Sequence, residues 1–226
     1  MKINDEKTQI LSVSSGQYET EANLLSRSGG LISSSSDLKM LGFIFSKSPS
    51  VQPQIDHLIR KANKRYFLLL HYKRAGILND RLKEVYCAMT RSLLEYSANV
   101  FHSQLNISQS KQLENIQKRC LKAIYGYDLK YSELLRISGL NTLQDRRIES
   151  FRKFTIKTSK NPKYSHWFPK REVQRPTRLY EPYQEETAVG STSRLHNSPI
   201  FAMRRIMNDS DNTPPENLAE FFHIPI

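Results

Sequence analysis

Between residues 54 and 160 the apolar side chains recur at the spacing of α-helices, and this periodicity limits the fold more than any other feature of the chain. The first such face consists of Ile55, Leu58, Ile59, Ala62, Tyr66 and Leu69. It predicts a helix over residues 54–74, and Gly76 has the conformational freedom that commonly ends one. Helices joined by short connections favour antiparallel packing in a bundle.

Four further helices are expected from the same pattern, over residues 80–104, 109–125, 130–138 and 142–160. The first of the four is predicted to be continuous and to bury one apolar stripe. That stripe consists of Leu82, Val85, Tyr86, Met89, Leu93, Tyr96 and Val100. Gly126 and Gly139 mark the ends of the next two helices. Thr142 and Asp145 have the spacing of a variant capping box at the start of the last helix.

The N-terminal residues have a different pattern, with two β-prone segments on either side of a Gly/Ser-rich loop. TQILSVS (8–14) and LKMLGFIFS (38–46) are these segments. Two strands alone are marginally stable in water, so they are expected to need a third strand or a helix to pack against.

Residues after 160 contain Pro, Ser, Tyr and Arg without periodicity, which predicts an irregular tail with about one helical turn near 201–207. The sequence therefore predicts a mainly α protein of the α+β kind. Its expected parts are a small β segment (1–48), a bundle of three to five helices (49–160) and an extended, largely irregular tail (161–226).

The chain of 226 residues is long enough for one sizeable domain or two small ones. No apolar run reaches the length of a membrane span, and the start, MKINDEKT, lacks the apolar core of a secretory signal. The two cysteines, Cys87 and Cys120, lack CxxC spacing and are expected to be reduced. These features predict a cytoplasmic or nuclear protein that is neither secreted nor in a membrane.

Positive charge is concentrated in the middle of the chain, although the whole chain has a net charge of +12. Residues 54–178 contain 26 Lys/Arg against 10 Asp/Glu, whereas residues 1–53 contain 5 of each and residues 179–226 contain 3 against 7. Such a basic segment favours a polyanionic partner, and the backbone of RNA or DNA is the expected one. A solvated basic surface without a partner is the alternative.

Two helices have rows of basic residues that suit phosphate contacts. The candidate nucleic-acid-binding residues are Arg60, Lys61, Lys64, Arg65, Lys73, Arg74, Arg146, Lys153, Lys157 and Lys160. The stretch 57–79 contains six basic residues and no acid. The aromatic residues near these rows are expected to belong to the core, and charge alone is expected to give salt-dependent binding with little sequence preference.

No catalytic constellation is visible in the sequence. The six histidines form no HExxH and no Cys/His ligand spacing, so no metal is expected. Phosphate-binding glycine motifs, a nucleophile elbow and a paired aspartate cluster are all missing. The chain is therefore predicted not to be an enzyme and to need no cofactor.

Glu95 lies within the otherwise mostly uncharged run RSLLEYSANVF (91–101), where a charge needs a reason. A structural ion pair with Arg91, four residues earlier, is predicted rather than a catalytic acid. A basic residue of another helix, Lys118 or Arg119, is an alternative partner. Loss of the partner of a buried carboxylate is strongly destabilising.

An ordered series of short motifs also runs through residues 1–170. It consists of Asn4-x-x-Lys7-Thr8, Leu41-Gly42, Lys61-Ala62, Leu94-Glu95-Tyr96, Gln117-Lys118-Arg119, Asn161-Pro162 and Ser165-His166-Trp167-Phe168. This series resembles the downstream part of a non-LTR retrotransposon reverse transcriptase of the jockey/CR1 kind. The resemblance implies that Lys7, Leu41 and Gly42 belong to the palm and to a primer-grip strand. It also implies that the basic helices form a thumb, which holds an RNA/DNA hybrid.

The catalytic Tyr-Ala-Asp-Asp motif of that family, and its upstream aspartate, precede the segment that corresponds to Asn4–Thr8, so neither is expected in this chain. The resemblance therefore implies a non-catalytic fragment of an RNA-directed DNA polymerase. Two alternatives remain open: a helical module that binds another protein chain, and a truncated retroelement remnant without a function.

Overall fold

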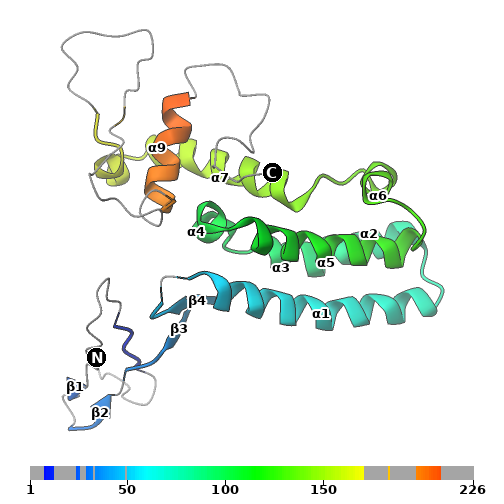
Figure 1. Ribbon diagram of the computed structural model, residues 1–226, viewed down its shortest axis with the longest axis horizontal. Coiled ribbons are helices and arrows are strands. Elements are labelled where there is room, and N and C mark those ends of the chain that lie inside the picture. The colour runs from blue at the N-terminus through cyan, green and yellow to red at the C-terminus, as the bar shows by residue number, and fades with distance from the viewer. Residues whose placement is uncertain are drawn as a thin grey trace. The chain divides into compact units, whose positions relative to one another are not determined.

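The computed structural model describes residues 8–12, 24–25, 29–32, 34–48, 50–170, 183 and 197–209. In this part of the chain the protein is mainly helical, with two small two-stranded sheets near the N-terminus (Figure 1). The predicted fold class is therefore confirmed. The chain divides into two compact units, unit 1 (residues 1–60) and unit 2 (residues 61–226).

Unit 1 contains two antiparallel pairs of short strands. β1 (Leu24–Leu25) pairs with β2 (Leu31–Ile32), and β3 (Asp37–Met40) pairs with β4 (Phe43–Ser46). The first β-prone segment makes an isolated parallel bridge between Ile10 and Ser34. Its residues 13–14 lie outside the described part of the chain.

The second β-prone segment forms a hairpin, so placing Leu41 and Gly42 within a strand was wrong. Both residues have positive φ, 49° and 81°, and make the two-residue turn between β3 and β4. A turn with two positive φ angles matches the twist of the flanking strands, and glycine adopts it readily. The leucine makes this turn hard to recognise, because a side chain at positive φ is disfavoured.

Helix α1 (Gln52–Arg74) begins in unit 1, and Gln54 in its first turn fixes the hairpin. The Gln54 Oε1 accepts a hydrogen bond of 3.0 Å from the backbone N–H of Ile44 in β4. Gln54 is fully buried, so this bond gives a polar side chain a partner inside unit 1.

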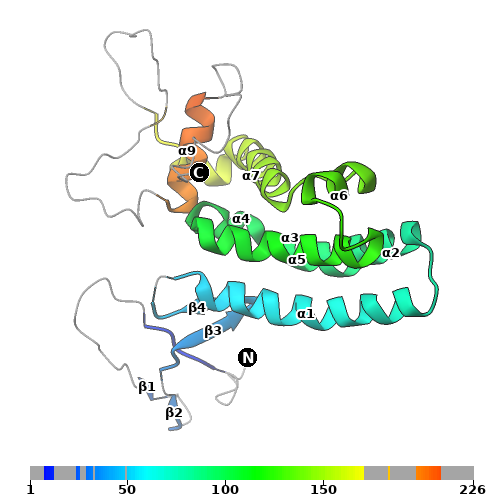
Figure 2. The same cartoon turned by 45° about the vertical axis from the view of Figure 1, so that its right-hand side comes forward.

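Unit 2 contains the rest of α1 and a series of helices (Figures 1 and 2). These are α2 (Asn79–Val85), the π-helix η2 (Tyr86–Arg91), α3 (Ser92–Glu95), α4 (Ala98–Phe101), the 3₁₀ helix η3 (His102–Gln104), α5 (Ile107–Tyr125), α6 (Tyr131–Ser138), α7 (Leu143–Ser159), the 3₁₀ helix η4 (Pro162–Trp167) and α9 (Pro199–Asp209). Residues 61–74 of α1 run beside α5, where Lys73 Nζ donates to the carbonyl oxygen of Ile124 at 2.8 Å.

The predicted continuous helix over residues 80–104 is wrong, because it is divided by η2 and by a break at Ser97, whose φ is 58°. The residues that it buries are Leu82, Tyr86, Thr90, Leu94, Ala98, Phe101, His102 and Ser103. Tyr96 and Val100, two members of the predicted stripe, are 50% and 42% exposed. A π-turn holds more residues than an α-turn, so the residues after η2 are rotated about the helix axis.

Thr142 and Gly139 begin and end helices as predicted, and α5 begins at a further cap, Asn106, that was not predicted. Asn106 accepts a hydrogen bond from the backbone of Gln109 at 2.8 Å and caps α5. Thr142 caps α7 by accepting one from the backbone of Asp145 at 3.0 Å. Gly139 ends α6 in the left-handed conformation that favours glycine.

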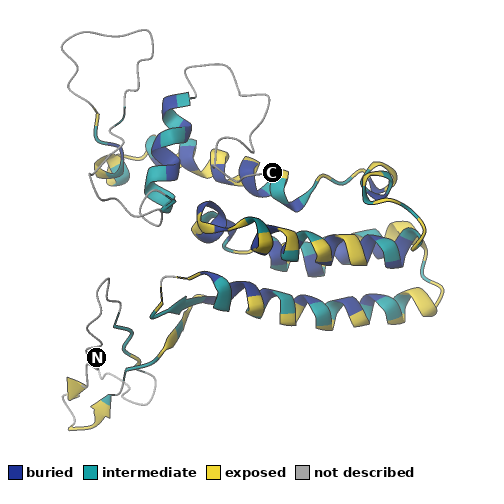
Figure 3. Cartoon of the chain, viewed as in Figure 1, coloured by how far each residue is buried: buried dark blue, intermediate teal, exposed yellow. Residues whose placement is uncertain are grey.

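Helix α9 is longer than the single turn predicted near residues 201–207. Its Ala202, Met203 and Ile206 pack with Ile148 and Phe151 of α7 in one buried cluster. Within α9 every position is buried or half-buried (Figure 3). A short helix is marginal alone in water, so this packing explains its length.

Candidate nucleic-acid interface

The lysines of α7 are exposed because the opposite side of the helix belongs to the core. Phe151, Thr155 and Thr158 are buried, and the Thr155 hydroxyl donates to the carbonyl oxygen of Phe151 at 2.9 Å. Lys157 and Lys160 lie on the other side and are exposed.

Asn161 and Pro162 end α7 and begin η4, which places Lys163 close to the end of α7 in the sequence and in space. The Asn161 backbone N–H donates to the carbonyl oxygen of Thr158 at 3.1 Å, and its side chain accepts from the backbone of Lys163 at 3.0 Å. Proline at the first helical position suits the new start.

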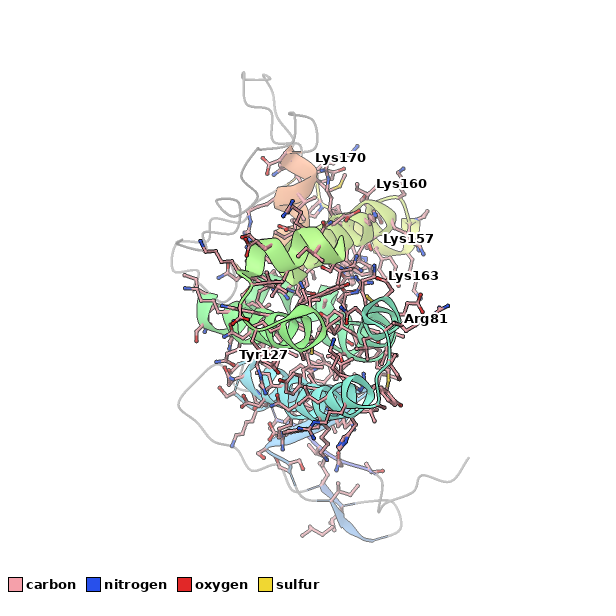
Figure 4. All side chains as sticks on the ribbon, turned by 90° about the vertical axis from the view of Figure 1, so that its right-hand side faces the viewer. Arg81, Tyr127, Lys157, Lys160, Lys163 and Lys170 are labelled. Carbon is pink, nitrogen blue, oxygen red and sulfur yellow. The ribbon has the colours of Figure 1, made fainter. Side chains whose placement is uncertain are left out.

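Four lysines gather on one side of unit 2, and we call them the lysine face. They are Lys157, Lys160, Lys163 and Lys170 (Figure 4). All four are exposed. Within the described part of the chain, no acid side chain forms an ion pair with Lys157, Lys160 or Lys163. Their charges are therefore available to a polyanion in solvent.

Lys153, a predicted binding residue on α7, forms a pair on its own helix. Its Nζ lies 2.5 Å from Glu149 Oε1, one turn earlier, and both side chains are mostly exposed. The pair holds the pKa of Glu149 below its ordinary value, through the hydrogen bond and then the lysine charge. Exposed pairs of this kind stabilise a helix only weakly and are easily rearranged.

Some residues of the predicted basic row of α1 also bind their own chain. Arg60, Lys61, Lys64, Lys73 and Arg74 are exposed, although Arg60 Nε donates to the carbonyl oxygen of Asp56 at 3.4 Å. Arg65 Nη1 instead donates to the carbonyl oxygen of Met89 in η2. Lys73 Nζ donates to Ile124, as described above, and to Asn79 Oδ1 at 2.7 Å. Arg65 and Lys73 therefore have structural partners within unit 2.

Arg146 is also engaged within the protein, where it is the close partner of Glu95. Its Nη2 donates to Glu95 Oε2 at 2.9 Å, and its Nε contacts Oε1. Arg91 Nε lies farther away, 4.0 Å from Glu95 Oε1. The hydrogen bonds to Glu95 raise the pKa of Arg146. Glu95 thus joins α3 to α7 with a two-pronged pair, the strong geometry for a guanidinium and a carboxylate.

The alternative partners for Glu95, Lys118 and Arg119, do not bind it. Arg119 Nη1 donates to Asn63 Oδ1 at 3.0 Å, and its guanidinium lies over the ring of Tyr66. Lys118 is exposed. The predicted ion pair with Arg91 is therefore present, but the sequence did not reveal the closer partner, Arg146, from the helix that packs beside α3 and α4.

Replacement of Glu95 by glutamine is expected to lower the free energy of unfolding by about 1–2 kcal/mol and to leave nucleic-acid affinity unchanged. The side chains of Glu95 and Arg146 are 25% and 35% exposed, so the loss lies between that of a surface pair and that of a buried one. Chemical denaturation of Glu95→Gln, Arg146→Gln and the double variant measures the coupling.

Glu84→Gln is the matched control, because Glu84 pairs with Arg81 at 2.9 Å through side chains that are 61% and 72% exposed. It should change stability less than Glu95→Gln does. Equal stability of Glu95→Gln and the wild type, combined with lost binding, would contradict the structural role of Glu95.

The residues assigned to the primer grip lie in the turn of unit 1 described above. Leu41 is highly exposed at that turn, and Gly42 follows it. Lys7, assigned to the palm by the same resemblance, lies outside the described residues.

Sequence reasoning missed Lys163 and Lys170 as members of a basic surface, because they follow the last periodic helix. It also missed that Arg147 is 1% exposed, although its neighbour Arg146 reaches the surface. Arg147 Nη2 donates to Ser110 Oγ at 2.9 Å. Burial lowers the pKa of Arg147. The only available signal was its spacing of four residues from Leu143 and Phe151, both buried.

Chemical reactivity is not evident at the groups that sequence analysis considered. Burial raises the pKa of the Cys120 thiol to about 12, so this cysteine is a poor nucleophile. No group of three or more His, Cys, Asp or Glu side chains suited to a metal ion occurs within residues that the structure describes. The helices in the same ranges also lack the combined length and hydropathy needed to cross a bilayer.

Comparison of the chain with protein-family models, with curated proteins and with solved structures finds no match. Function is therefore inferred from the geometry of its own side chains.

Proposed function

We propose that unit 2 binds the sugar–phosphate backbone of RNA or DNA by charge, with little preference for sequence. The observation that supports this best is the lysine face, in which four exposed lysines lie on one side of the unit (Figure 4). The net charge of +12 adds a long-range attraction for polyanions.

Lysine suits this role, because its ammonium group is a mobile point charge that contacts phosphates without reading bases. Each phosphate that a lysine neutralises releases condensed counterions, and this release drives binding at low salt. Lys157 lies in the last turn of α7 and Lys160 directly follows the helix, where the helix dipole also favours positive charge. The dipole explains why these two lysines are tolerated there, but it does not explain the presence of Lys163 and Lys170 on the same face.

The same proposal includes an origin in a reverse transcriptase of the non-LTR kind, with unit 2 as a thumb-like bundle that no longer takes part in catalysis. The ordered motifs given above support it, and the basic surface of a helical unit fits a part that holds template and primer. The chain itself is proposed to be non-catalytic. Nucleotide incorporation by the purified chain in a primer-extension assay with Mg²⁺ would contradict this.

Substitution of Lys157, Lys160 and Lys163 together by glutamine is expected to reduce the slope of log K against log salt by about 2–3, because roughly one counterion is released per lysine–phosphate contact. The fluorescence of Trp167, the only tryptophan, gives a local readout, because it lies in η4 together with Lys163. A titration with duplex and with single-stranded DNA over a salt series measures the slope.

The matched control replaces Lys111, Lys130 and Arg136 by glutamine, which removes the same charge from exposed positions outside the lysine face. This control variant should bind with nearly wild-type affinity and keep most of the slope of log K against log salt. If both triple variants behave alike, net charge rather than the lysine face governs binding. A wild-type affinity that is insensitive to salt, or no binding at about 50 mM salt, would contradict the proposed function.

A second candidate function, a module that binds another protein chain, is favoured by the surface of unit 1. Its exposed apolar side chains are Leu24, Leu25, Leu31, Met40 and Leu41. Within the described residues β3 and β4 pair only with each other, so the outer edge of β3 has no strand partner, whereas Gln54 accepts a hydrogen bond from Ile44 on the outer edge of β4. Open strand edges and exposed apolar groups favour pairing with another chain. Concentration-dependent association in sedimentation that added salt does not weaken would support this function.

A further inference from the structure

A second surface of unit 2 combines a fixed arginine with an exposed tyrosine, and we call it the Tyr127 cluster. It consists of Asn63, Tyr66, Arg119, Lys122 and Tyr127. The guanidinium carbon of Arg119 lies 4.5 Å from the centroid of the Tyr66 ring. Asn63 Oδ1 accepts a hydrogen bond from Arg119 at 3.0 Å. These two contacts hold the plane of the guanidinium at the surface between α1 and α5.

Both the hydroxyl and the backbone carbonyl of Tyr127 have partners, although its side chain is exposed. Its hydroxyl lies 3.3 Å from the hydroxyl of Tyr66, and its backbone carbonyl oxygen accepts from Lys122 Nζ at 3.0 Å. The residue is nevertheless 58% exposed. An aromatic ring that packed only for stability would be expected to be buried.

The contacts of Arg119 with Asn63 and Tyr66 suffice to join α5 to α1, so they explain part of the cluster structurally. They do not explain why the ring of Tyr127 is held in solvent. A ring that is already ordered loses little conformational entropy when a flat partner stacks on it.

The basic residues of α5 that precede Tyr127 in the sequence favour an anionic partner. Lys118, next to Arg119 on α5, is exposed, and no acid among the described residues forms an ion pair with it. Asp128 is the one exposed acid next to Tyr127 in the sequence. In Figure 4, Tyr127 lies on the opposite side of unit 2 from the lysine face.

We propose that Tyr127 is a stacking platform for a base of single-stranded RNA or DNA, with Arg119 and Lys118 close to the phosphates of that strand. This inference rests on the proposed function and adds to it a preference for unpaired nucleic acid. A base inside a duplex has both faces covered, whereas an unpaired base offers a face to an aromatic ring.

The test compares a fluorescent single-stranded oligonucleotide, oligo(dT), with a blunt DNA duplex of the same length. Tyr127→Ala is expected to weaken binding of oligo(dT) about tenfold and to leave duplex binding unchanged. Its salt slope for oligo(dT) should stay at the wild-type value, because the ring neutralises no phosphate. Tyr127→Phe keeps the ring and should bind like the wild type.

Tyr96→Ala is the matched control, since Tyr96 is 50% exposed in the segment between α3 and α4. It should bind oligo(dT) like the wild type. Circular dichroism and thermal unfolding establish that each variant is folded. Equal weakening for oligo(dT) and duplex, or no weakening at all, would overturn the stacking role while wild-type binding to the lysine face remains.

Tyr127→Trp in a Trp167→Phe background gives a direct readout that a folding defect cannot imitate. The introduced indole would be the only tryptophan of the chain, and stacking of a base should quench its fluorescence at saturating oligo(dT). Binding without quenching would place the strand elsewhere and overturn the inference. Absence of any salt-dependent binding by the wild type would instead refute the proposed function on which the inference rests.

Discussion

Replacement of His102 by glutamine is expected to make unit 2 much less sensitive to acid, because protonation of His102 causes a large part of the loss of stability at low pH. His102 is 4% exposed, and its ring packs at 5.7 Å from that of Phe151. Burial, and then the charge of Arg147, lower the pKa of His102 from 6.5 to about 3. A neutral imidazole is therefore built into the folded protein at physiological pH.

The sign of the effect follows from the two pKa values. Below pH 6.5 the unfolded chain takes up a proton on His102, whereas the folded protein takes it up only near pH 3. His102 therefore has no effect on stability well above pH 6.5 and lowers it as the pH falls from 6.5 toward 3. At pH 5 the loss is about 2 kcal/mol, because each unit of pKa difference corresponds to about 1.4 kcal/mol.

Urea denaturation at pH 7 and pH 5 measures this loss for the wild type and for His102→Gln. Glutamine also changes packing, so the informative quantity is the difference between the two pH values within each protein. His166→Gln is the control, since His166 is exposed in η4. The His166→Gln variant should lose as much stability between pH 7 and pH 5 as the wild type does. An equal loss in His102→Gln and the wild type would show that His102 does not carry this pH dependence.

Local signals made much of the helical part predictable. Gly139 and Thr142 end or cap helices through bonds and backbone angles that involve only neighbours in the chain, and so does Asn106, although it was not predicted. Apolar spacing then identified the buried faces of α1 and α5, where Ile55, Leu113 and similar residues are inaccessible. Short-range chemistry decides such features, so one sequence suffices.

The register after residue 86 was not predictable in this way. One additional residue in η2 changes which side chains face the core, and Ser97 then adopts a left-handed conformation that serine rarely prefers. Arg65, from α1, covers the carbonyl oxygen of Met89 in η2. The irregular turn is thus supported by a residue more than twenty positions away, which periodicity does not reveal.

In the candidate site, too, some features were predictable from the sequence and others were not. The sequence identified α7 as basic, but it did not separate Arg146, which binds Glu95, from Lys157, which faces solvent. Arg147, adjacent to Arg146, is buried against Ser110. Which cations remain available depends on the neighbouring helices, and one sequence gives no direct information on those neighbours.

Gln117 is the residue whose replacement is expected to have the largest effect on the packing of unit 2. It is fully buried, and its Oε1 accepts a hydrogen bond of 2.7 Å from the Tyr86 hydroxyl. Its Nε2 donates to the Tyr131 hydroxyl at 2.9 Å and to the carbonyl oxygen of Asn141 at 3.0 Å. One amide therefore joins α5 to η2, to α6 and to the segment before α7.

The network continues to the start of α7 through Glu114. The Tyr131 hydroxyl donates to Glu114 Oε1, and both carboxylate oxygens accept from the backbone N–H of Leu143, at 3.2 and 3.1 Å. A carboxylate at a helix N-terminus is favourable, since it binds free N–H groups and faces the positive end of the dipole. Burial and this hydrogen bond raise the pKa of Tyr131, so its hydroxyl remains a donor.

Gln117→Leu is expected to lower the free energy of unfolding by about 3 kcal/mol, because it leaves the buried hydroxyl of Tyr86 without an acceptor and the carbonyl of Asn141 without a donor. Tyr86→Phe alone is expected to cost about 1–2 kcal/mol, since only one hydrogen bond is lost. Chemical denaturation of both single variants and of the double variant gives the coupling between the two residues.

In the Gln117→Leu background, Tyr86→Phe should cost less than it does in the wild type, because the hydroxyl that it removes has already lost its acceptor. Additive losses would mean that the two side chains do not depend on each other. Gln117 also precedes Lys118 and Arg119, which face solvent on the same helix. At temperatures where Gln117→Leu remains folded, its affinity for oligo(dT) should therefore equal that of the wild type, which separates the role of α5 in the core from its role at the surface.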